Sequence, residues 1–188
     1  MSLIDPRLDK QKCINRAMQS YVLMMYEFVL ELNPKNVLEI GAQRGQSTKT
    51  MLMALKMLGS GKLVSIDIKN CSNILGEGFE DLKPYWHFIK GSSHDAETFQ
   101  KAKDALKAEE FYDMMFIDGD HKMPGVGQDF YEYSKLIKPG GIIMLHDVTN
   151  KNEDVKELWK EITWDKFVID WGRCRSNVTP GFGIVRKP

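Results

Sequence analysis

Apolar residues recur at helical spacing in the first part of the chain and then fall into short, regularly spaced runs. The first pattern covers residues 14–32 and predicts a helix that ends before Pro34, because proline cannot continue a helix. Five apolar runs then alternate with segments of helical periodicity, which predicts strands that alternate with helices. The five strands are expected at residues 37–40, 63–68, 87–91, 112–120 and 142–147.

The segments between these runs predict the connecting helices. They are expected from residue 47 or 48 to 58, at 95–109 and 126–137, and after the fifth strand at 152–161. Residues 70–84 predict a loop with a short helix, and the sequence KPGG at 138–141 predicts a turn. Two last apolar runs, 166–171 and 181–186, leave no room for a helix between them and predict an antiparallel hairpin.

This alternation determines the expected fold class. Parallel strands joined by helices form a sheet that is covered on both faces. We therefore expect an α/β fold with a doubly wound, seven-stranded sheet, mostly parallel and completed by the C-terminal antiparallel hairpin. Because we find no repeat or low-complexity linker, residues 1–188 are expected to form a single domain, with an N-terminal helical segment at 1–32.

Composition narrows the classes of partner. Hydrophobic residues make up 43% and charged residues 28%, as in soluble globular proteins. Lysine plus arginine equals aspartate plus glutamate, at 26 each, so no net charge attracts nucleic acid or an anionic membrane. The three scattered cysteines form no zinc or disulfide pattern, and no signal peptide or spanning segment is recognised. We therefore expect a cytoplasmic protein with reduced thiols.

Polar residues and glycines gather where the predicted strands end. In a doubly wound sheet, ligands bind at the carboxyl ends of the strands, so these residues are expected to share one rim. They are Glu39, Gly41, Asp67, Gly91, Ser92, Asp118, Asp120, His121, His146 and Asp147. Because five separate strands contribute to this set, it predicts a ligand site at that edge of the sheet.

The sequence LEIGAQRGQST at 38–48 places two glycines between a strand and a helix. A dinucleotide site requires G-x-G-x-x-G, and a P-loop requires lysine followed by serine or threonine, and neither pattern occurs here. Gly41 and Gly45 therefore predict that a ligand without phosphate approaches the main chain closely. The alternative is that the glycines only let the helix pack closely against the strand.

These motifs together resemble the class I S-adenosylmethionine-dependent methyltransferases, from about residue 37 to the final hairpin. LEIGAQRGQS is similar to the first motif of the catechol and caffeoyl-CoA O-methyltransferases. IDGDHKMPGVGQDF followed by LIKPGGIIMLHD resembles a related group that includes macrolide-sugar O-methyltransferases and proteins labelled cephalosporin hydroxylase. The resemblance implies a Rossmann-like domain that binds S-adenosylmethionine and methylates a hydroxyl of a small molecule.

For the methionine end of the cofactor, the resemblance implies four residues. Gly41 and Gly45 would lie against the methionine portion, and Ser47 would help to bind its carboxylate at the start of a helix. Glu39 would orient the loop or reach the amino group. Ser47 or Thr48 is also the expected N-cap of that helix.

For the nucleoside end, the resemblance implies residues that follow the second and third strands. Asp67 would accept hydrogen bonds from the ribose hydroxyls, Ile68 would pack on adenine, and Ser92, Ser93 and His94 would contact the adenine edge. Each has a structural alternative. The aspartate could cap a loop, the serines could cap a helix, and the histidine could be an ordinary surface residue.

The reaction requires an aligned acceptor and, for a hydroxyl, removal of its proton. His121 is the expected general base because imidazole titrates near neutral pH, and it stands roughly where catechol-type enzymes carry a basic lysine. Its alternative role is to tie two loops together. Asp118 is expected to border both the cofactor and the acceptor.

The resemblance also implies a metal site. Asp118 and Asp147 match two carboxylate ligands of a divalent cation, normally Mg²⁺, which would hold the acceptor oxygens. Val148 stands where the catechol type has a third oxygen ligand, and Asn150 or Asp120 is the candidate substitute. The resemblance thus supports a cation site but leaves its third ligand open.

Two other functions compete with O-methylation. His121, Asp118 and His146 could form the iron site of an oxygenase, but adjacent residues of an extended strand, such as His146 and Asp147, point to opposite sides. A cofactor-binding protein without catalysis is the other alternative. For partners we expect a small-molecule acceptor, such as a sugar hydroxyl or another diol, and no nucleic acid or membrane. The long first helix is a candidate homodimer surface, with core packing as its alternative.

Overall fold

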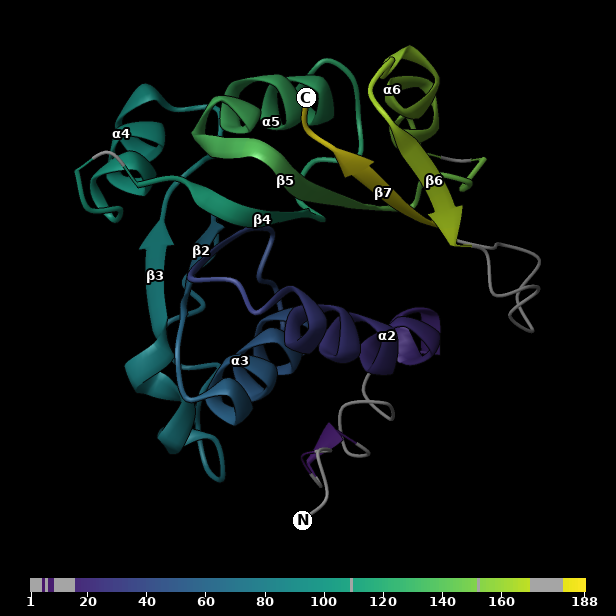
Figure 1. Ribbon diagram of the computed structural model, residues 1–188. Coiled ribbons are helices and arrows are strands. Elements are labelled where there is room, and N and C mark those ends of the chain that lie inside the picture. Colours follow the sequence, from purple (N-terminus) through teal and green to yellow (C-terminus); the bar gives the residue numbers. More distant parts are fainter. Residues whose placement is uncertain (1–4, 6, 9–15, 109, 152, 170–180) are drawn as a thin grey trace.

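Figure 1 shows the computed structural model, which describes residues 5, 7–8, 16–108, 110–151, 153–169 and 181–188. The strands are β1 (Asn36–Ile40), β2 (Lys62–Asp67), β3 (Trp86–Lys90), β4 (Tyr112–Ile117), β5 (Ile137–His146), β6 (Lys166–Ile169) and β7 (Phe182–Arg186). The helices are α2 (Arg16–Leu32), α3 (Gln46–Leu58), α4 (Ala96–Asp104), α5 (Gly125–Tyr133) and α6 (Val155–Glu161). Two 3-10 helices are η1 (Glu80–Tyr85) and η2 (Ser134–Leu136).

The strands form one seven-stranded sheet in the order β3-β2-β1-β4-β5-β7-β6. The first five strands are parallel, whereas β7 pairs antiparallel with both β5 and β6. The predicted α/β fold class and the C-terminal antiparallel pairing are therefore confirmed. Residues 170–171 of the predicted hairpin lie outside the described residues, as do residues 14–15 of the first predicted helix.

The alternation of apolar side chains along each strand builds a core on both faces of the sheet. Val37 is in register with Leu63 and Met114, and these side chains face α2 and α3. The next row, which begins with Leu38, faces the opposite layer of α4, α5 and α6. Figure 1 shows α2 and α3 on one side of the sheet and α5 and α6 on the other.

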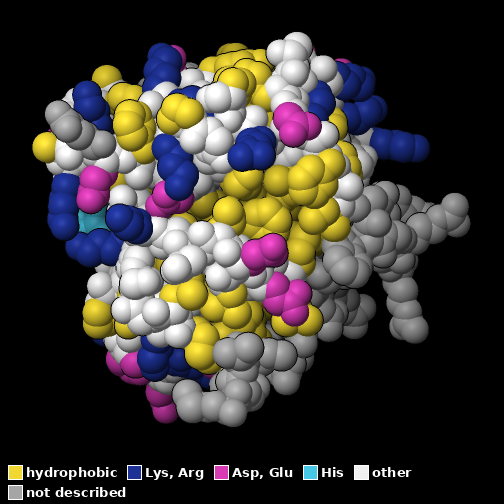
Figure 2. Space-filling view, in the orientation of Figure 1, with side chains coloured by type: hydrophobic (Ala, Val, Ile, Leu, Met, Phe, Trp, Pro, Cys, Tyr) yellow, Lys and Arg dark blue, Asp and Glu magenta, His cyan; other side chains and the backbone are white. Residues whose placement is uncertain are grey.

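The apolar stripe of α2 packs inside the protein. Tyr21, Met25 and Val29 are fully buried against the core that α3 and the sheet provide. This supports core packing, the alternative to a dimer surface, for that stripe. Apolar side chains also gather on the surface between α2 and the β5–β7 half of the sheet, as Figure 2 shows.

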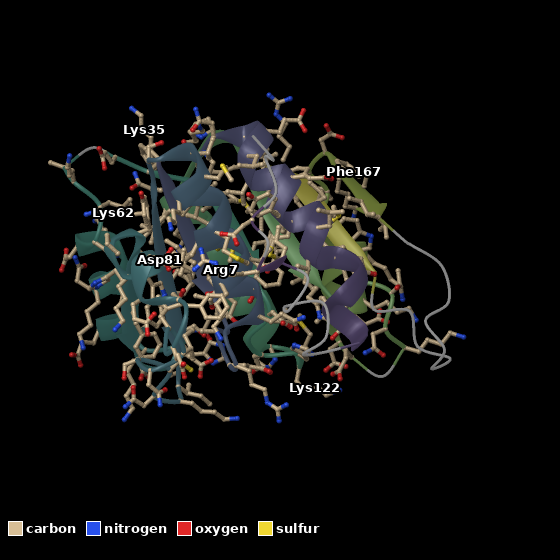
Figure 3. The ribbon with its side chains drawn as sticks, turned by 90° about the horizontal axis from the view of Figure 1, so that it is seen from below. Arg7, Lys35, Lys62, Asp81, Lys122 and Phe167 are labelled. Atoms are coloured by element: carbon tan, nitrogen blue, oxygen red, sulfur yellow. The ribbon has the colours of Figure 1, made fainter. Side chains whose placement is uncertain are left out.

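An ion-pair network holds the N-terminal segment against η1. Arg7 Nη2 lies 2.8 Å from Asp5 Oδ2, and Arg7 Nη1 lies 2.7 Å from Asp81 Oδ1. Lys56 of α3 contacts the same Asp81 carboxylate. Figure 3 shows Arg7 beside Asp81, so Asp5 and Arg7 are held against η1.

Several predicted boundaries are wrong. The helix expected at 126–137 ends at Tyr133 and continues as η2, and β5 already begins at Ile137. The predicted KPGG turn lies inside β5, where Gly140 has a φ of 74° and the register against β4 shifts. A glycine in the left-handed conformation lets one strand carry extra residues opposite its partner. The KPGG sequence therefore forms a bulge within β5 and not a turn between two elements.

Other elements are shorter than expected. The strand predicted at 112–120 ends at Ile117, α4 ends at Asp104, and α6 begins at Val155. Polar residues after Ile117 therefore form a loop at the rim. Within the described residues, no helix is long and apolar enough to cross a membrane.

The strand order creates a crevice between β1 and β4. From β1 the chain moves outward to β2 and β3, whereas β4 lies on the other side of β1 and leads to β5. The loops that follow β1 and β4 therefore lead to helices on opposite faces. Such a reversal of strand order is where doubly wound sheets bind ligands.

Candidate active site

A cavity of about 410 Å³ opens at the carboxyl ends of β1, β2, β3 and β4. It brings together most of the residues that the sequence predicts for the cofactor. They are Gly41, Asp67, Ile68, Ser92, Ser93 and Asp118. His94 also lines the cavity, whereas Glu39, Gly45 and Ser47 do not border it.

Gly41 is required by the neighbouring strand. Its φ is 96°, and a Cβ added there would come within 2.1 Å of the Asp118 carbonyl oxygen. The main chain of the β1 loop therefore lies directly against the end of β4, with the cavity beside it. The close approach shown at Gly41 is that of protein backbone, and the approach of a ligand stays a prediction.

Gly45 has a different role from the one expected. It is the N-cap of α3, with a φ of 76° and no side-chain cap, so neither Ser47 nor Thr48 caps this helix. A Cβ at Gly45 would come within 2.7 Å of the Ile74 side chain. Gly45 therefore lets the start of α3 lie close to Ile74, in the segment between β2 and η1, and its contact with the methionine portion stays a prediction.

Glu39 is the centre of a buried hydrogen-bond network beneath the loop. Its Oε1 accepts from Ser47 Oγ at 2.6 Å, and its Oε2 accepts from Thr48 Oγ1 at 2.7 Å and Ser65 Oγ at 2.6 Å. The Ser47 hydroxyl therefore donates to Glu39, and its role in binding the cofactor carboxylate stays a prediction. Burial raises the pKa of Glu39 to about 7, although these hydrogen bonds lower it.

Asp67 and Ile68 lie side by side at the end of β2. Asp67 accepts hydrogen bonds from the main-chain N–H groups of Gln43 at 2.8 Å and Lys69 at 2.7 Å. It thus caps the loops, as its alternative proposed, and also lines the cavity. Ile68 is 68% exposed, an unusual state for a large apolar side chain at a cavity wall.

The β3 loop forms the next wall. Ser92 Oγ accepts from the main-chain N–H of His94 at 3.2 Å, so it stabilises the loop. His94 Nε2 lies 3.2 Å from Oδ1 of Asp129, a fully buried carboxylate on α5. Sequence reasoning missed Asp129, although an acidic residue next to Phe130 in a predicted helix was a usable signal.

Beside the cavity, four side chains form what we call the acid–histidine cluster: Asp118, His121, His146 and Asp147. His121 Nε2 lies 3.0 Å from Asp118 Oδ1, and His121 Nδ1 lies 3.3 Å from Asp147 Oδ2. His146 Nδ1 lies 3.3 Å from Asp118 Oδ1 and 3.2 Å from Asp147 Oδ2. Asp118 also lines the cavity, so it belongs to both sites.

The position of Asp147 contradicts one expectation. His146 and Asp147 were expected to point to opposite sides, but β5 ends at His146 and Asp147 has a φ of 64°. This left-handed backbone turns the carboxylate back toward the preceding imidazole. Non-glycine residues in this region are uncommon and deserve a functional explanation.

Each charge in the cluster stabilises its neighbours. Burial alone would raise the pKa of Asp118, but the positive charge of His146 and the hydrogen bond with His121 lower it to about 2. Burial alone would lower the pKa of His146, but the negative charge of Asp118 raises it to about 10. The hydrogen bond with Asp118 raises the pKa of His121. Both imidazoles are therefore favoured in the protonated form in this arrangement.

Some of these residues have metal-ligand geometry. Asp118, His121 and Asp147 each offer one ligand atom, and these atoms lie within 4.8 Å of one another. Of the expected substitutes for the third ligand, Asn150 donates through Nδ2 to Asp147 at 3.3 Å. Asp120 accepts a hydrogen bond from the main-chain N–H of Lys122 and does not join the group.

A family described as "Methyltransferase domain" matches residues 38–148, more than half of the chain. The chain belongs to this methyltransferase family. The matched segment begins in β1 and ends directly after the acid–histidine cluster. No curated protein matches the chain.

Solved structures of the same fold include O-methyltransferases. An O-methyltransferase from Bacillus cereus in complex with SAH has a TM-score of 0.72 at 18% identity, covering 98% of this chain and 92% of that chain. TomG from Streptomyces achromogenes, an O-methyltransferase involved in tomaymycin synthesis and in complex with SAM, has a TM-score of 0.69 at 17% identity, with coverage of 98% and 91%. Cofactor-bound Rv0187 from MTB has a TM-score of 0.71 at 17% identity, covering 98% and 92%. The Rossmann-like methyltransferase fold is therefore confirmed.

The contact between Gly41 and the Asp118 carbonyl can be tested by comparing Gly41 with Gly59, a second glycine in the left-handed conformation. Gly41→Ala is expected to lower the free energy of unfolding by about 2–5 kcal/mol, from backbone strain plus the clash with Asp118. Gly59→Ala is the matched control, because its φ is 70° and no atom lies within 4 Å of the added Cβ. It should cost only the strain, about 1–2 kcal/mol. Equal losses in urea unfolding would show that the Asp118 contact is unimportant.

The pKa of Glu39 predicts a specific pH dependence of stability. Between its ordinary value of 4.5 and about 7, the folded chain retains a proton that the unfolded chain has released. The free energy of unfolding should therefore fall as pH rises through this range, and Glu39→Gln should remove this fall. Urea unfolding at pH 5, 6, 7 and 8 measures it, with the exposed Glu27→Gln as control. A constant difference between wild type and Glu39→Gln would contradict the assignment.

Proposed function

We propose that the protein transfers the methyl group of S-adenosylmethionine to a hydroxyl of a small molecule. The observation that carries this proposal is the position of Asp118, which borders the cavity and also contacts His121. A cofactor in the cavity and an acceptor at the acid–histidine cluster would thus be neighbours. The family match and the SAH and SAM complexes of the structural neighbours support the choice of cofactor.

The walls of the cavity suit a nucleoside that carries an amino acid. Asp67 is held by two main-chain N–H groups, and a fixed carboxylate at this position can accept hydrogen bonds from both ribose hydroxyls. Ile68 is exposed beside it and offers an apolar surface to a purine. The methionine end of the cofactor would then lie near the end of β1, beside the Gly41 main chain and the loop that Glu39 supports.

The reaction moves one methyl group and one proton. The acceptor oxygen forms a bond to the methyl carbon as the carbon–sulfur bond breaks, which leaves S-adenosylhomocysteine. The proton of the hydroxyl passes to His121, the partly exposed histidine of the cluster. Because Asp118 favours the protonated imidazole, His121 acts as a base only at a pH above its ordinary value.

The resemblance also implies a divalent cation such as Mg²⁺. Asp118 and Asp147 would hold it, since their carboxylates converge on one point. When bound, such an ion polarises an acceptor hydroxyl and lowers its pKa. Sugar hydroxyls and other diols are the proposed acceptors, because two adjacent oxygens can share one ion.

Two alternatives differ from this proposal in measurable ways. The histidines and carboxylate of the oxygenase hypothesis do lie together, but that hypothesis leaves the cavity between β1 and β4 without a role. A binding protein without catalysis would bind the cofactor yet release no S-adenosylhomocysteine with any acceptor.

Ile68 tests the cofactor site. Ile68→Ala should weaken S-adenosylmethionine binding about five- to thirtyfold in calorimetry, because apolar contact with adenine is lost. Phe167→Ala is the matched control, since Phe167 is 54% exposed and lies on β6 (Figure 3). Wild-type affinity in Ile68→Ala, or an equal loss in both variants, would contradict the placement of adenine.

His121 tests the reaction. His121→Gln should lower turnover about 10²- to 10⁴-fold while the Kd for S-adenosylmethionine stays within about twofold. Wild-type turnover should rise with pH through an apparent pKa above the ordinary value of 6.5, and the variant should lack this rise. Release of S-adenosylhomocysteine is measured across a panel of catechols, sugars and other diols. Undiminished turnover in the variant would exclude His121 as the base.

A further inference from the structure

His146 has a buried nitrogen that the proposed reaction does not use. Its side chain is 8% exposed, and its Nδ1 faces the carboxylates of Asp118 and Asp147. The distances are 3.3 Å to Asp118 Oδ1 and 3.2 Å to Asp147 Oδ2, so the nitrogen is in ion-pair contact with both. This nitrogen therefore lies between two carboxylates in the buried part of the cluster, where either a proton or a shared cation can hold the three groups together.

The distances from His146 Nδ1 to the two carboxylate oxygens match the distances between neighbouring ligand atoms around a metal ion. Ligand atoms about 2.1 Å from a metal ion lie about 3.0–3.4 Å apart, for right-angled to tetrahedral arrangements. Asp118 Oδ1 and Asp147 Oδ2 lie at such distances from His146 Nδ1. One ion placed among them would be bound by His146 Nδ1 and by both carboxylates, which His121 also contacts.

We propose that His146 is the third protein ligand of a divalent ion held by Asp118 and Asp147, and that its nitrogen selects a transition metal over Mg²⁺. Imidazole suits Fe²⁺, Co²⁺, Ni²⁺ and Zn²⁺, whereas Mg²⁺ prefers oxygen ligands. The inference extends the proposed function, since this ion would lie beside the acceptor hydroxyl. It replaces the oxygen-only set that the resemblance implies.

The residues next to His146 in the sequence explain why the third metal ligand would come from position 146. Val148 is 1% exposed and packs in the core that faces α5 and α6, so it leaves the expected position without a donor. The left-handed backbone of Asp147 brings the preceding residue to the same side instead. His121 lies on the more exposed side of both carboxylates, where it can still reach the acceptor.

Metal binding is tested on the whole protein after chelation. Co²⁺ should raise the Tm and develop visible absorption bands at concentrations where Mg²⁺ leaves the Tm unchanged, because only the bound ion stabilises the folded state. Equal stabilisation by both ions would overturn the selectivity. The absence of any effect from Co²⁺ would overturn the site.

The matched variants are His146→Asn and His87→Asn. Asparagine presents an oxygen near the position of Nδ1, so His146→Asn should bind Co²⁺ at least tenfold more weakly and lose most of the preference over Mg²⁺. His87 is an exposed histidine on β3, far from the cluster in sequence and on the edge of the sheet, and its variant should behave as wild type. Unchanged Co²⁺ affinity in His146→Asn would overturn the role of His146.

A further measurement does not depend on the folding of His146→Asn. With ¹⁵N-labelled histidine, Zn²⁺ should shift the Nδ1 resonance of one ring, and this shift should persist in His87→Asn and His121→Gln. A shift that disappears in His121→Gln would assign the nitrogen ligand to His121 instead and overturn the proposal. Calorimetry with S-adenosylmethionine in metal-free buffer tests the proposed function separately, so failure of one is distinguishable from failure of the other.

Discussion

The approach of the Gly41 main chain to the Asp118 carbonyl is the constraint on which the site depends. It joins the loops after β1 and β4 at the point where the strand order reverses, and main-chain hydrogen bonds from Gly41 to Ile66 and from Asp118 to Ile40 extend the pairing there. Because no side chain fits at position 41, the two loops meet backbone to backbone beside the cavity. Asp118 is thereby held where its carboxylate can serve two sites.

The acid–histidine cluster depends on a second backbone feature, the left-handed conformation of Asp147. It gathers two carboxylates and two imidazoles beside the cavity, where each charge compensates another. Such a group is costly to bury unless every charge has a partner. The cluster lies beside the cavity of about 410 Å³, which supports a chemical role for it.

The sequence was sufficient for the fold and for the rim. The strands and the residues after them follow from apolar periodicity, and the rule that ligands lie at carboxyl ends predicts the rim. Asp67 and Asp118 are expected at the cavity on this basis, whereas Ile68 is expected there only from the resemblance. The role of a residue that depends on the direction of its side chain cannot be predicted from periodicity or from position after a strand. Ser47 was assigned to the ligand, but its hydroxyl faces Glu39, which no spacing rule reveals. His146 was set aside because strand geometry was assumed to continue through Asp147, and one positive φ reverses that conclusion.

A crystal structure of the protein with bound S-adenosylhomocysteine tests the central claim most directly. The account predicts the ribose at Asp67, the purine on Ile68 and the sulfur facing Asp118 and the acid–histidine cluster. Density for the ligand at any other surface, or in the cavity with its purine toward Asp118, would contradict it.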